Sequence, residues 1–168
     1  MTQISMYAAS VPVLARALRN LSAVLRKGEV HAAARNVDES VLLGYRLAPD
    51  MFPLTRQVQI ACDMAKGCVA RLAGAEVPSY ADDEKTFADL QARIEKTLAF
   101  IESFQPSQID GSEARPVTLK MRSGERSFQG LPYLLDFVLP NVYFHGAMAY
   151  AILRHCGVEL GKADFLGA

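Results

Sequence analysis

The chain has 168 residues, the length of one ordinary domain, and at that size roughly 70% of the unfolded surface can be buried on folding. Apolar residues make up 51% of the chain and charged residues 21%, a mixture that excludes a disordered protein. Eighteen basic residues balance eighteen acidic ones, so no overall field attracts nucleic acid or an anionic membrane surface. We therefore expect a single folded domain over residues 1–168 that binds neither.

Export and membrane insertion are both disfavoured by the apolar pattern. The first segment has no basic stretch ahead of a continuous apolar run, and Arg16 and Arg19 interrupt its apolar positions. An uninterrupted apolar run of about 18 residues, as a spanning helix needs, does not occur. Cys62, Cys68 and Cys156 lie inside helical patterns, and an odd count argues against a disulfide framework. These features predict a cytoplasmic protein with reduced core thiols.

Apolar residues at steps of three and four predict a first amphipathic helix from about Ser5 to Lys27, which we expect Gly28 to end. Pro12 falls inside this pattern. The helix therefore either starts near Pro12 or bends there. The apolar positions that define the helix are Met6, Tyr7, Val11, Leu14, Leu18, Leu21 and Leu25.

A shorter, mixed pattern follows, with helical turns expected at 30–36 and at 38–47, the second capped by Asp38. Pro53 is suited to the first turn of a second long helix, which should reach Ala73 and end at Gly74. Small residues recur along the apolar stripe of this helix. They would let another helix pack closely against it.

The third long helix shows the clearest stripe, from Phe87 to Phe104, and Asp82 or Asp83 should cap it. Alternating residues around a Ser-Gly turn then predict a β-hairpin of 116–121 and 126–128. A last helical region should extend over 131–156, interrupted at Pro140. Four long helices in one small chain make a bundle the simplest architecture, and the tail from Gly161 should pack on it as an ordered extension.

Three segments carry a recognisable signature: PLTRQVQIACDMAKGCVARLAG at 53–74, DEKTFADLQARIEKT at 83–97 and PNVYFHGAMAYAILRHCGVELGKADFLG at 140–167. Together they resemble a bacterial family of uncharacterised proteins among the DinB/YfiT-like helical bundles. The resemblance covers most of the chain and implies an all-α four-helix bundle with short extra helices and a small β-hairpin before the last helix. Known members of the wider superfamily include thiol-dependent transferases and isomerases.

The resemblance also implies a divalent-metal site of three histidines, one on the second long helix and two in a His-x-x-x-His pair on the fourth. His145 matches one histidine of that pair, but Ala149 stands four residues later, and no histidine occurs in 53–74. In a nickel or zinc site of this family type, neutral imidazoles supply most of the affinity for the metal. We therefore predict a degenerate metal site, no metal and no other cofactor; if a metal binds, His145 is its ligand.

His145 lies on the face of the last helix that should point into the bundle. It is either a buried histidine bonded to a neighbour or a ligand-binding group, since imidazole titrates near neutral pH. The candidate partners on the second helix are Gln57, Asp63 and Lys66, although Asp63 and Lys66 are three residues apart and can also pair with each other. Tyr143 completes this candidate ligand-binding set, and the catalytic residues, if there are any, stay unidentified.

Two functions follow as hypotheses. The first is a metal-free binding or interaction module of the DinB-like class that forms a homodimer through its helix faces or its C-terminal tail. The second is a small-molecule or thiol-dependent transferase or isomerase with an altered metal site around His145. Phosphate-binding loops, nucleophile elbows and His-Glu-x-x-His motifs are absent from the sequence, so no motif identifies a reaction.

Overall fold

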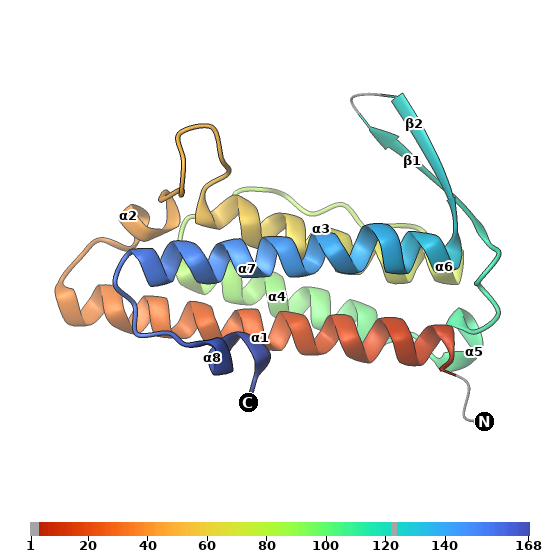
Figure 1. Cartoon of the computed structure of the whole chain (residues 1–168), viewed down its shortest axis with the longest axis horizontal. Helices are drawn as coiled ribbons and strands as arrows, with labels where there is room; N and C mark the ends of the chain where they lie inside the picture. The colour runs from red at the N-terminus through yellow and green to blue at the C-terminus, as the bar shows by residue number, and fades with distance from the viewer. Residues whose placement is uncertain (1–3, 122–123) are drawn as a thin grey trace.

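The computed structural model of the protein describes residues 4–121 and 124–168. It is mostly helical and has a single β-hairpin in this part of the chain, which confirms the expected fold class (Figure 1). None of the described helices combines the length and the apolar character needed to cross a membrane. The bundle consists of α1 (Met6–Arg35), α3 (Leu54–Ala73), α4 (Phe87–Glu102) and α7 (Leu139–His155).

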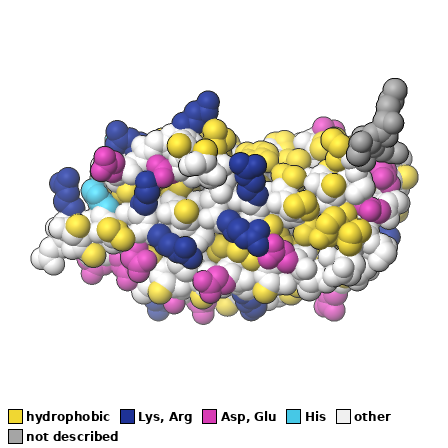
Figure 2. All heavy atoms as spheres, turned by 90° about the horizontal axis from the view of Figure 1, so that it is seen from below, with side chains coloured by type: hydrophobic (Ala, Val, Ile, Leu, Met, Phe, Trp, Pro, Cys, Tyr) yellow, Lys and Arg dark blue, Asp and Glu magenta, His cyan; other side chains and the backbone are white. Residues whose placement is uncertain are grey.

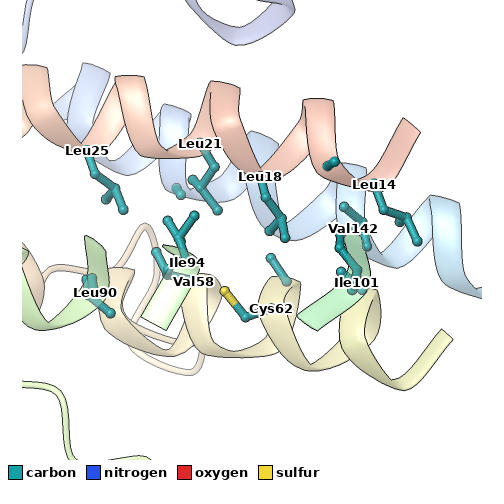
Figure 3. Close-up of a cluster of buried hydrophobic side chains, with 14 of the residues drawn as sticks. Leu14, Leu18, Leu21, Leu25, Val58, Cys62, Leu90, Ile94, Ile101 and Val142 are labelled. Atoms are coloured by element: carbon teal, nitrogen blue, oxygen red, sulfur yellow. The ribbon is translucent and has the colours of Figure 1, made fainter. Parts of the chain in front are cut away.

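The four long helices surround one apolar core. Helix α1 packs against α4 and α7, and α3 packs against the same two helices from the other side. Figure 3 shows the leucines of α1 pointing across the bundle toward side chains of α3, α4 and α7. They recur at steps of three and four, so one helix face buries all of them. These residues are Leu14, Leu18, Leu21 and Leu25, which face Val58, Cys62, Ile94 and Val142 among others.

The prediction that Gly28 ends the first helix is wrong. Helix α1 begins at Met6, ahead of Pro12, and continues to Arg35, where Asn36 in the left-handed region (φ 54°) caps it. A Cβ atom at Gly28 would lie 3.0 Å from a methyl group of Leu153 in α7. Gly28 therefore serves the close approach of α1 and α7, a tertiary role that the local pattern cannot distinguish from a helix stop.

The sequence identified the N-cap of α2 and the end of α3, but not the N-cap of α4. Asp38 caps the short helix α2 (Glu39–Leu43) by accepting a hydrogen bond from the Ser40 amide, and α3 runs to Ala73 as predicted. Helix α4 differs, because its cap is Thr86 and neither Asp82 nor Asp83. The Thr86 hydroxyl and the side chain at the third helical position form a reciprocal capping box, which satisfies two free backbone amides.

The hairpin lies where the alternation predicted it, after the short helix α5 (Pro106–Ile109). Strands β1 (Pro116–Met121) and β2 (Gly124–Gln129) pair antiparallel with Val117 opposite Phe128, and the hairpin projects away from the side of the bundle near the end where α5 and α6 lie (Figure 1). The expected Ser-Gly turn lies partly outside the described residues. Where the hairpin joins the bundle, the Leu131 amide donates a hydrogen bond of 2.9 Å to the Glu113 carbonyl.

The last helical region is continuous but not uniform. After α6 (Gly130–Pro132), residues Tyr133–Val138 form a π-helical turn, η1, which passes into α7 just before Pro140. Proline has no amide hydrogen to donate, and the Asn141 side-chain amide donates to the Phe137 carbonyl at 2.7 Å. The interruption predicted at Pro140 is thus a change from π-helical to α-helical hydrogen bonding, and the chain stays helical across it. Helix α8 (Lys162–Leu166) closes the chain by packing on α1 and α7.

Candidate functional site

His145 is paired with Gln57, one of its three predicted partners. Its Nδ1 atom lies 2.7 Å from Gln57 Oε1, and Gln57 Nε2 donates to the Phe52 carbonyl at 3.0 Å. Because Gln57 turns its oxygen toward the imidazole, Nδ1 carries the hydrogen and Nε2 keeps its lone pair. Burial, with a smaller contribution from the nearby positive charge of Arg56, lowers the pKa of His145. The imidazole is therefore neutral at neutral pH.

The surroundings of His145 do not fit the metal site that the resemblance implies. The side chain that meets its Nδ1 atom is the Gln57 amide, a weaker ligand for a transition metal than imidazole. One turn further along α7, Ala149 is fully buried and offers only a methyl group. Among the described residues, no group of three or more His, Cys, Asp or Glu side chains could hold an ion. The side chains around His145 are thus those expected for a buried histidine that is hydrogen-bonded to a neighbour, and they do not form a set of metal ligands.

Asp63 takes part in a different structure, the Arg93 cluster, which consists of Arg93, Asp63, Lys66, Asp82 and Glu84. Arg93 lies 3.0 Å from Asp63, 3.0 Å from Asp82 and 2.7 Å from Glu84, and it also donates to a loop carbonyl. Lys66 pairs with Asp63 at 2.8 Å, as the three-residue spacing indicated. In the described part of the chain, no hydrogen bond or ion pair joins Asp63 to His145.

The Arg93 cluster fastens the loop of residues 75–86 to α3 and α4. The Arg93 side chain is only 2% exposed, although it belongs to a surface helix. Tyr80 of the loop lies against three cations, with the Lys66 and Lys96 ammonium groups 3.7 Å and 4.3 Å from its ring centre. Burial alone would raise the pKa of Glu84, but hydrogen bonds from Arg93 and Gln59 outweigh it and lower that pKa. The carboxylate is thus held charged as a structural anchor.

Tyr143, the fourth predicted site residue, lines a separate cavity that we call the α1–α7 hollow. It lies between α1 and α7, beneath α8, and has a volume of about 710 Å³. Ala17 of α1, Gly146 of α7 and the buried Ala61 of α3 line it, and Phe165 of α8 lies at its edge. Small side chains from three helices leave the space that larger ones would fill. The volume is within the range of small-molecule sites.

One edge of the α1–α7 hollow is polar. Arg16 donates to the Leu166 carbonyl at 3.1 Å, and Asn20 donates to the Phe165 carbonyl at 3.2 Å, so α1 holds α8 in place. A salt bridge of 2.6 Å between Lys27 and Asp164 adds to this attachment. Figure 2 views the molecule from below and shows hydrophobic side chains gathered on the right half of this face, with Lys and Arg side chains beside them.

The α1–α7 hollow was not predicted from the sequence. The predicted site residues are polar side chains on α3 and α7, whereas the hollow is lined mainly by small and apolar residues of α1, α7 and α8. Apart from Tyr143, the available signal was the run of small residues on the second long helix, which includes Ala61. That pattern was interpreted as close helix packing, and both outcomes look alike in a sequence.

Cys62 is not a nucleophile in this arrangement. Its side chain is fully buried at the centre of the bundle (Figure 3), and burial raises the pKa of its thiol to about 12. The nearby Arg93 charge and a hydrogen bond with Thr97 act in the opposite direction but do not compensate. A thiol with this pKa stays protonated at neutral pH and is unreactive, as expected for a core cysteine.

Comparisons with known proteins place the fold and the family. Residues 6–166 match the model of a domain of unknown function, DUF1993. The crystal structure of a DinB family member protein from Shewanella denitrificans is 41% identical to this chain, with a TM-score of 0.88. That match covers 96% of this chain and 92% of the other. None of the curated proteins matches the chain.

Proposed function

Because the chain belongs to the DUF1993 family of domains of unknown function and has a DinB-like bundle fold, we propose that it is a metal-free binding module for a small apolar molecule. The proposal is carried by the α1–α7 hollow, a cavity of about 710 Å³ lined mainly by small and apolar side chains. Burial of apolar ligand surface there supplies the driving force. The poor match of His145, Gln57 and Ala149 to a metal-binding set supports the metal-free part.

Filling the α1–α7 hollow should strongly weaken binding of a neutral apolar probe. We expect 1-octanol to bind the wild-type protein in isothermal titration calorimetry and to lose affinity about tenfold or more in Ala17→Leu, because the new side chain occupies the ligand's volume. Ala33→Leu is the matched control, since it makes the same change on an exposed position of α1. Equal octanol binding by both variants, or a stoichiometric transition metal in the purified protein, would contradict the proposal.

The alternative function is a thiol-dependent transferase or isomerase with its site around His145. It predicts the opposite result in the same binding experiment. An enzyme of that kind would bind its small molecule beside the His145–Gln57 pair. Our proposal requires that His145→Gln leave octanol affinity unchanged, because His145 does not line the α1–α7 hollow. The alternative is favoured if His145→Gln removes ligand binding while Ala17→Leu does not.

The homodimer stays a prediction, and the exposed aromatic residues of α7 support it. Phe144 is 52% exposed and Tyr143 is 45% exposed, although aromatic side chains gain free energy when buried at an interface. We expect analytical ultracentrifugation to show a dimer and Phe144→Glu to shift it toward monomer, because a charge would be buried. The exposed Val30→Glu variant of α1 controls for the added charge. A monomer at all concentrations would refute the dimer.

A further inference from the structure

We infer that the ligand of the α1–α7 hollow carries one carboxylate, which Arg16 receives at the edge of the cavity. This inference rests on the proposed function and specifies the ligand class as an apolar body with a single anionic head. Arg16 is the only charged residue among the described residues that line the hollow. Since no acidic side chain lines it, the electrostatic preference of the site is for an anion.

The guanidinium of Arg16 can donate to a second hydrogen-bond acceptor besides the Leu166 carbonyl. Its Nη2 atom donates to the Leu166 carbonyl at 3.1 Å, which fixes the guanidinium at the edge of the hollow, next to α8. A guanidinium has five N–H groups in a planar fork, so this one hydrogen bond leaves donors that match the two oxygens of a carboxylate. No carboxylate of the described residues lies within salt-bridge distance of Arg16. By contrast, Arg19, one turn later on α1, is paired with Glu102.

Asn20 gives the polar edge a second fixed donor. It lies one helical turn beyond Arg16 on the same face of α1, and its amide nitrogen donates to the Phe165 carbonyl at 3.2 Å. Helix α8 carries the carboxylate of Asp164, which is already paired with Lys27, with 2.6 Å between Oδ1 and Nζ. An incoming carboxylate therefore meets cationic and amide donors at this edge while its apolar chain occupies the space beside Ala17 and Gly146.

The test compares two probes of equal chain length, octanoate and 1-octanol, by isothermal titration calorimetry below the concentrations at which they aggregate. We expect wild-type protein to bind octanoate about tenfold more tightly than octanol, because a charge-assisted, bidentate hydrogen bond is added. Arg16→Gln should remove this preference, so that octanoate and octanol bind this variant with equal affinity. Arg19→Gln, the matched control, should retain the preference, because Arg19 does not line the hollow.

The outcomes separate the two proposals. Equal affinity for octanoate and octanol in the wild-type protein, with both lost in Ala17→Leu, would overturn the carboxylate inference and leave the binding module standing. A preference for octanoate that survives Arg16→Gln would also overturn it, because the anion would then be bound elsewhere. If neither probe binds the wild-type protein, the proposed function fails and the inference fails with it.

Discussion

Replacing Arg93 by methionine is expected to destabilise the protein by about 3 kcal/mol in urea-induced unfolding. Arg93 is the shared partner of Asp63, Asp82 and Glu84. Its loss leaves the carboxylate of Glu84 without a counter-charge, whereas Asp63 keeps Lys66 and Asp82 keeps Arg56. Glu84 is affected most, because only 9% of its side chain is exposed. Asp63 and Asp82 remain partly hydrated, which keeps the cost at the lower end of what breaking a buried ion pair requires.

Arg19→Met is the matched control for the loss of a guanidinium. Arg19 and Glu102 form an ion pair in which both side chains are well exposed, so its removal should cost less than about 1 kcal/mol. Similar free energies of unfolding for Arg19→Met and Arg93→Met would show that the Arg93 cluster contributes no more than a surface pair. Loss of the cluster should also release the loop of residues 75–86, which hydrogen exchange would detect.

Because of the Arg93 cluster, we expect the free energy of unfolding to fall as the pH is lowered. The folded-state pKa of Glu84 is lowered, so its contribution is fully present above the unfolded-state pKa and is lost as the pH falls through the folded value. Arg93→Met removes the larger of the two side-chain hydrogen-bond effects that lower this pKa. The variant should therefore lose less further stability than wild type when unfolding is compared between neutral and acidic pH.

Gly130→Ala is expected to destabilise the protein by about 3 kcal/mol, measured by the same unfolding experiment. A Cβ atom at Gly130 would lie 2.0 Å from the Ser112 carbonyl oxygen, which is a backbone atom and cannot rotate away. That oxygen also accepts a hydrogen bond from the Arg115 amide at 3.0 Å, which holds it in position. The segment leading into β1 must therefore move away from α6, and the amide of Leu131 should exchange faster.

Gly146→Ala is the matched control for added volume at a glycine. The nearest atom to its new Cβ would be in the Phe165 ring at 3.6 Å, an ordinary contact distance. Because Gly146 lies inside α7, alanine should even stabilise the helix by up to about 1 kcal/mol. If both glycine variants unfold alike, the contact between Gly130 and Ser112 is not the cause of the effect.

The sequence alone determined the bundle and most of its boundaries, because the relevant signals are local. The step of three and four between apolar residues identified α1, α3 and α4, and alternation identified the hairpin. Pro53 and Gly74 marked the ends of α3, since each has a conformational preference that acts within one turn. His145 pointing into the bundle followed from the same periodicity, as its contact with Gln57 shows.

Only the tertiary structure decided which side chains lie together in one cluster or cavity. Asp63 belongs to the Arg93 cluster because the loop after α3 supplies Asp82 and Glu84 and helix α4 supplies Arg93. Gly28 lies inside α1, at a point where Leu153 of α7 packs closely against it. The α1–α7 hollow exists because α1, α7 and α8 meet there, which residue spacing within any one of them does not encode. Periodicity specifies which face of a helix is buried, whereas the packing of distant segments determines which neighbour each buried face meets.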